Sequence, residues 1–269
     1  GSFLKVVLKR PEAIGSAFSM SCGMILNLLR FGQLGYLQWF IRQSFKQFQS
    51  QSASRQSALT DELMPRLHSL HVLGFVSEDF KILDKGRAAC AISSGGELLL
   101  CTLISEDLLF EAQPMQVWAF LSRFLAEPLN NVSKQRDPAR DESYSEQVKQ
   151  PGKDWLEALK RKASHAAATL DDVLQSHGVN SRLRSALEQQ QGFESAVLKW
   201  LEGATVGETL SKAPGLDPGT FVTLIRRLEG LAHQMILAAA ILKKTDLVLK
   251  FEAGLKHLRR GLPFKDTLY

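Results

Sequence analysis

Two adjacent arginines, Arg226 and Arg227, carry the side chains best suited to chemistry in this sequence of 269 residues. A guanidinium group keeps its charge at physiological pH and can hold a phosphate through a planar fork of N–H donors. Both arginines fall within 219–242, where apolar residues recur with the spacing of a helix that buries one face. The segment therefore predicts a helix whose polar side could carry a phosphate backbone. The apolar positions are Leu224, Ile225, Leu228, Leu231, Met235 and Ala239.

The start of this helix is also marked in the sequence. Asp217 is a typical N-cap residue, and Pro218 suits the first helical position, where its missing N–H is not needed. An alternative interpretation of the arginines needs no ligand, because Arg226 could pair with Glu229 one turn further on. From the residues alone, such a surface ion pair is the simpler interpretation.

No catalytic motif is found elsewhere. The phosphate-cradling pattern Gly-x-x-x-x-Gly-Lys-Ser/Thr and the nucleophile pattern Gly-x-Ser-x-Gly are absent, and no histidine has a zinc-like spacing. The adjacent acids Asp171 and Asp172 would point in different directions on a helix, which indicates solubility residues. We expect no catalytic residue, no metal site and no cofactor in this chain.

Bulk composition constrains the function only loosely. The net charge of +5 and the pI near 9.1 permit nucleic-acid binding without requiring it. Charged or polar residues interrupt every apolar run, so no membrane-spanning segment is expected. Three cysteines without metal-like spacing (Cys22, Cys90 and Cys101) indicate reduced thiols in an intracellular protein.

The elements that must position the arginines divide into two groups. Over 3–95 the pattern predicts helices at 18–30, 36–49 and 59–73, with a short polar link at 50–58. Short β-prone runs follow at 75–76, 82–83 and 87–92, and three helices followed by a small hairpin is the order of a winged-helix domain. Over 96–269 the pattern predicts a helical bundle interrupted by a polar loop at 127–153. Its helices are expected at 97–105, 114–126, 153–176, 181–190, 193–202, 206–213, 219–242 and 245–260.

Several short segments, taken in order, resemble the C-terminal part of the superkiller-family DExH-box RNA helicases, which are helicase cofactors of the RNA exosome. The closing region resembles their DSHCT domain. The segments that carry the resemblance are Met24–Arg30, Arg42–Phe48, Leu73–Phe75, Lys85–Ile92, Gly96–Leu100, Trp200 with Gly203–Thr205, Ile225–Glu229, Lys250–Glu252, Arg259–Arg260 and Thr267–Tyr269.

The resemblance implies a mainly α fold, in which a winged helix with a small β-hairpin wing precedes a helical "ratchet" bundle. It implies the C-terminal part of an ATP-dependent 3′-to-5′ RNA helicase that guides single-stranded RNA and braces RecA-like motor domains for RNA processing or degradation. ATP and Mg²⁺ would bind in the motor domains, which this sequence lacks. Exosome-associated proteins would be its partners, inside the nucleus, the cytoplasm or an organelle. The RNA contacts would come from Arg227, Arg226, Thr223, Gly230 and Trp200.

Two other functions stay open, a protein-interaction scaffold and a winged-helix binder of duplex DNA. The family usually has a glutamate at Gly230, an arginine at Thr223 and an aromatic residue at Val206. These departures also fit a non-catalytic protein-interaction scaffold derived from such a helicase. A tryptophan at the end of an amphipathic helix, such as Trp200, is commonly a core residue, and Arg259 with Arg260 indicates a structural role. The 59–73 helix is a poor duplex-DNA recognition helix, because Asp61 and Glu62 offset its basic residues.

Overall fold

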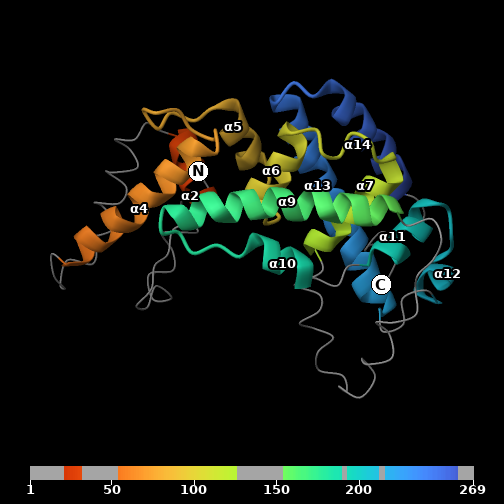
Figure 1. The fold of residues 1–269 in the computed structure, drawn as a ribbon. Coiled ribbons are helices and arrows are strands. Elements are labelled where there is room, and N and C mark those ends of the chain that lie inside the picture. Colours follow the sequence, from red (N-terminus) through yellow and green to blue (C-terminus); the bar gives the residue numbers. More distant parts are fainter. Residues whose placement is uncertain (1–20, 32–53, 126–153, 190–192, 212–215, 260–269) are drawn as a thin grey trace, which may run out of the picture.

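The computed structural model describes residues 21–31, 54–125, 154–189, 193–211 and 216–259, and within them the chain is mainly helical (Figure 1). The predicted helix over 36–49 and the polar loop over 127–153 lie outside these residues. The helices are α2 (Cys22–Phe31), α4 (Ser54–Val72), α5 (Asp84–Ala91), α6 (Glu97–Ser105), α7 (Pro114–Leu121), the 3₁₀ helix η2 (Ser122–Leu125), α9 (Asp154–Ser176), α10 (Leu183–Gln189), α11 (Glu194–Leu201), α12 (Val206–Ser211), α13 (Pro218–Ile241) and α14 (Thr245–Leu258).

Helix α13 is the centre of the packing. It contacts α14, α5, α6, α7 and η2, and its buried side includes Phe221, Leu228 and Met235. Helix α9 crosses the bundle and contacts α4, α6, α7 and α10 (Figure 1). The helices predicted between 97 and 260 are confirmed, with ends that differ by a few residues, because their apolar periodicity matches the faces that the fold buries.

The predicted β-prone run over 87–92 is wrong, because residues Asp84–Ala91 form helix α5. The alanines of this segment favour a helix, and the buried small residues Gly86, Ala88 and Ala89 let that helix lie close to its neighbours. A Cβ atom at Gly86 would lie 2.3 Å from the carbonyl oxygen of Phe75. Of the predicted hairpin wing, the described residues show a single antiparallel bridge between Val76 and Ile82.

The core is continuous across the predicted boundary between 95 and 96. Buried apolar residues from Ile25 to Leu258 form one cluster, and α5 packs directly on α13. The division into 3–95 and 96–269 therefore stays a prediction. None of the described helices is long and apolar enough to cross a membrane.

A glycine fixes the contact between α7 and α14. Trp118 of α7 is fully buried, its indole N–H donates to the carbonyl oxygen of Phe251 at 3.3 Å, and the two rings lie 5.4 Å apart. A Cβ atom at Gly254 would lie 2.2 Å from the Trp118 ring. The absence of a side chain at Gly254 therefore lets α14 reach the indole.

A buried ion pair joins η2 to the start of α11. The Arg123 guanidinium donates to the Glu194 carboxylate with N–O distances of 2.6 and 2.8 Å, and it also donates to the carbonyl oxygen of Leu187 at 3.2 Å. Both side chains are less than a tenth exposed. Because both charged groups are removed from water, each is stabilised by the opposite charge of its partner.

Removing one partner of this pair should destabilise the fold strongly. We expect Arg123→Met to lower the free energy of unfolding by about 3–5 kcal/mol, because it leaves the Glu194 carboxylate buried without a counter-charge. The double variant Arg123→Met, Glu194→Leu should recover much of that loss. Urea denaturation followed by circular dichroism measures both effects. A double variant no more stable than the single one would contradict this account.

The three thiols should react slowly in the folded chain. Burial raises the pKa of Cys22 and of Cys90 to about 11, and that of Cys101 to about 12. At pH 8 the first two should thus hold about a hundredfold less thiolate than a thiol of pKa 9, and a disulfide reagent should label them correspondingly slowly. Because each thiol has a higher pKa in the folded chain than in the unfolded chain, the three thiols make their full contribution to the free energy of unfolding below pH 9. That contribution declines as the pH rises further. Fast labelling of Cys101 before unfolding would contradict its burial.

Candidate nucleic-acid interface

The N-terminus of α13 is formed as the sequence predicts. Asp217 is the N-cap, and its side chain accepts a hydrogen bond from the backbone N–H of Thr220 at 2.9 Å, while Pro218 occupies the first turn. Hydrogen bonds from the side chain and then the backbone of Thr220 hold the pKa of the Asp217 carboxyl below its usual value. The cap stabilises the first turn of the helix that carries the candidate residues.

Four of the five predicted RNA-binding residues lie on the exposed side of α13. Thr223, Arg226, Arg227 and Gly230 are all exposed, whereas the residues between them are buried or half-buried. Steps of four and then three residues join Thr223, Arg227 and Gly230, which places them on one face of the helix. We call these four residues the α13 stripe.

Arg227 has no partner in the described part of the chain: neither a hydrogen bond nor an ion pair joins it to another described residue. The nearby acid is already engaged, because Glu229 accepts from Arg259 at 2.8 Å. Arg259 also lies 2.9 Å from Nε2 of His233. Arg259 thus has a structural role between α14 and α13, as predicted, and Arg260 lies outside the described residues.

Packing within the described chain does not explain why position 230 is a glycine. A Cβ atom built there would meet no heavy atom within 4 Å. Glycine in the interior of a helix costs about 1 kcal/mol relative to alanine, and nothing described around Gly230 offsets that cost. A molecule outside this chain that comes close to the helix at Gly230 would account for the glycine.

Trp200 does not belong to this surface. Its side chain is 3 % exposed, its indole N–H donates to the carbonyl oxygen of Leu258 at 3.3 Å, and its ring packs edge-on against Phe221. A ring enclosed in this way has no free face for a base to stack on. The prediction of Trp200 as an RNA-binding residue is corrected accordingly, and its role is to pack α11 against α13 and α14.

Comparison with known proteins decides the family. Residues 79–265 match the DSHCT (NUC185) domain. The chain belongs to the DSHCT domain family. It is 31 % identical over 218 residues to the "ATP-dependent RNA helicase mtr4" of Schizosaccharomyces pombe, an alignment that covers 81 % of this chain and 18 % of the relative. It is 30 % identical over 209 residues to the human "Exosome RNA helicase MTR4", covering 78 % of this chain and 18 % of the relative.

A third relative aligns over nearly the whole chain. The "Antiviral helicase SKI2" of Saccharomyces cerevisiae is 23 % identical over 268 residues, which is 98 % of this chain and 20 % of the relative. The chain therefore spans about a fifth of the length of these relatives. The resemblance predicted from the short segments is confirmed, and the chain is consistent with the C-terminal region of an exosome-cofactor helicase.

Two polar contacts that order the DSHCT fold were missed by sequence reasoning. Gln234 of α13 accepts from the backbone N–H groups of Ser93 and Ser94 at 2.9 and 3.2 Å, and it also bonds both serine hydroxyls. Asp171 is buried and accepts from the backbone N–H groups of Leu183 and Arg184 at 2.9 Å, so it caps α10 and is not a solubility residue. No periodicity indicates either contact, because each joins segments distant in sequence.

Among the described residues of the DSHCT chain, no group of three or more histidine, cysteine or acidic side chains is placed to hold a metal ion. His68 and His71, which stand three apart, have other contacts. His68 packs against the rings of Phe80 and His177, and Nδ1 of His71 lies 3.3 Å from the carbonyl oxygen of Val76. The α13 stripe is therefore the candidate site.

Two helical glycines of the DSHCT chain should respond oppositely to alanine. Gly230→Ala should raise the free energy of unfolding by about 0.5–1 kcal/mol, because the new methyl group enters open space and improves helix propensity. Gly254→Ala should lower it by about 1–3 kcal/mol, because its methyl group overlaps the Trp118 ring. Thermal unfolding of both variants beside the parent chain tests the pair, and destabilisation by Gly230→Ala would show a packing role that the structure lacks.

Proposed function

We propose that this chain is the C-terminal part of an ATP-dependent 3′-to-5′ RNA helicase that feeds RNA to the exosome. In this proposal α13 guides single-stranded RNA, and the bundle braces the motor domains, which bind ATP and Mg²⁺. The observation that carries the proposal is Arg227, an exposed cation without a partner in the described chain, on a helix of a DSHCT-family protein. The names of the relatives support RNA as the ligand and the exosome as the partner, because both relatives are named as RNA helicases and one as an exosome helicase.

The chemistry of the α13 stripe favours contact with the RNA backbone. A guanidinium group binds phosphate oxygens regardless of the base attached, and Gly230 leaves room for a strand to approach the helix closely. None of the four residues of the stripe is aromatic, so the stripe itself offers no aromatic platform on which a base could stack. We therefore expect binding that tolerates changes of sequence and weakens as salt is added.

Arg227→Ala should weaken the binding of single-stranded RNA to a similar degree for every sequence tested. The slope of log affinity against log salt should become shallower by about 0.7 for each phosphate group that the variant no longer neutralises. Fluorescence anisotropy with labelled homopolymeric and mixed RNAs over a range of salt concentrations measures both quantities. Arg227→Lys should retain part of the affinity, since it keeps the charge but loses the planar fork.

Arg161→Ala provides a matched control. Arg161 is exposed on α9 and, like Arg227, has no hydrogen bond or ion pair to another described residue. The substitution Arg161→Ala removes the same charge from a different helix. It should therefore leave the slope of log RNA affinity against log salt unchanged. Equal effects of the two substitutions would show that general electrostatic attraction holds the RNA, and that the α13 stripe is not a specific site. No RNA binding by the parent chain would instead favour the protein-interaction scaffold.

A further inference from the structure

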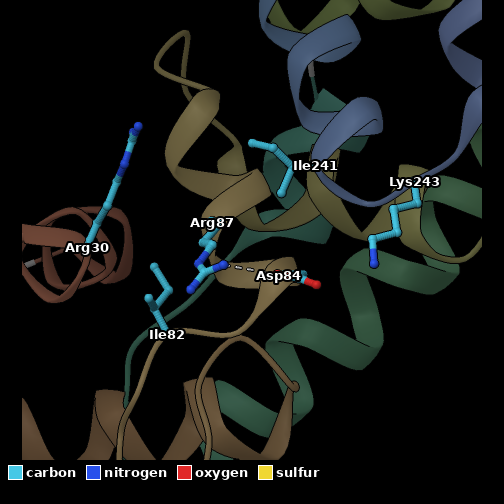
Figure 2. Close-up of a pocket in the computed structure, with 6 residues that line it drawn as sticks. All are labelled: Arg30, Ile82, Asp84, Arg87, Ile241 and Lys243. Atoms are coloured by element: carbon cyan, nitrogen blue, oxygen red, sulfur yellow. Dashed lines mark hydrogen bonds and ion pairs between the residues drawn. The ribbon is translucent and has the colours of Figure 1, made fainter.

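A basic recess lies where α2, the start of α5 and the end of α13 meet. It is open to solvent, has a volume of about 580 Å³ and is lined by Arg30, Ile82, Asp84, Arg87, Ile241 and Lys243. Figure 2 shows Arg30 and Lys243 at opposite sides of the view, with the two isoleucines, Asp84 and Arg87 between them. Segments that are distant in sequence thus build one hollow. None of its lining residues belongs to the α13 stripe.

The lining carries an excess of positive charge. Three cationic side chains stand against one carboxylate, a net formal charge of +2. The acid, Asp84, lies 3.4 Å from Arg87, but both side chains are more than half exposed, and such a pair leaves much of the arginine's field available. Lys243 is exposed on the turn that ends α13 and has no partner among the described residues. Arg87 and Lys243 can therefore both receive an incoming carboxylate.

Two aliphatic side chains decide which class of ligand fits. Ile82 and Ile241 are only half-buried in the free chain and supply apolar surface between the cations. Contact with a nucleic-acid backbone makes no use of apolar surface, and none of the six lining residues is an aromatic platform for a base. An apolar surface with a cationic rim instead complements a peptide with one apolar anchor and acidic neighbours.

We propose that this recess binds an acidic peptide segment of a protein partner, with one aliphatic side chain of the peptide placed against Ile82 and Ile241. Carboxylates on either side of that anchor pair with Arg87 and Lys243. The buried anchor supplies most of the affinity, and the charges fix the orientation and speed the association. This site is independent of the RNA contact proposed for the α13 stripe.

The test uses a panel of short fluorescent peptides rich in Asp and Glu, each with one central Leu, Ile or Val, beside counterparts with Ser at that place. At least one aliphatic peptide should bind the chain about tenfold or more tightly than its Ser counterpart, because the anchor leaves water. Lys243→Asn should weaken that binding about tenfold. Asparagine tolerates the left-handed backbone of this position, where φ is +59°, so the variant should fold. Ile241→Ala should reduce the preference for the aliphatic anchor.

Lys256→Asn is the matched control, since Lys256 is exposed on α14 and has no partner among the described residues. It should leave peptide binding unchanged, and so should Arg227→Ala. Three results would each overturn the proposal: aliphatic and Ser peptides that bind alike, equal effects of Lys243→Asn and Lys256→Asn, or an equal loss of peptide and single-stranded RNA affinity in Lys243→Asn. The last result would assign the recess to an RNA path.

Discussion

The burial of one face of α13 is the constraint on which the rest of the structure depends. Several neighbouring elements approach that face, among them α14, α5, α6, α7 and η2. Small or missing side chains let two of these elements pack closely within the bundle: Gly86 and the buried alanines in α5, and Gly254 where α14 meets Trp118 of α7. Once these neighbours occupy their places, a single side of the helix remains for other molecules. Arg227 and Gly230 stand on that side because the buried residues take all the other positions. The candidate site is therefore a consequence of core packing.

Polar groups inside the bundle set the positions of the shorter helices. The Arg123–Glu194 pair ties η2 to α11, and Asp171 of α9 holds the first turn of α10. Such contacts add less to stability than their charge suggests, since desolvation opposes the attraction. They do specify geometry, because a misplaced helix would leave a charge or a carboxylate buried without its partners.

Much of this arrangement could be predicted from the sequence. The stripe of Leu224, Leu228 and Met235 and the Asp217 cap are local signals, and they placed α13 correctly. Helix α5 was misjudged, because its alanine-rich run has too little apolar periodicity to separate helix from strand. The resemblance implied an RNA contact for Trp200, whereas its place at the end of an amphipathic helix is typical of the core, where the fold puts it. The contact of Arg259 with Glu229 joins two helices, so only the fold could reveal that Glu229 is engaged and Arg227 is left without a partner among the described residues.

One side chain determines how the segment after α5 is attached to the central helix. Gln234 makes all four of its hydrogen bonds to two consecutive serines. Three of these bonds are accepted by the same amide oxygen, which receives both backbone N–H groups and the Ser94 hydroxyl. Loss of this one side chain would therefore deprive two consecutive backbone N–H groups of their acceptor at once.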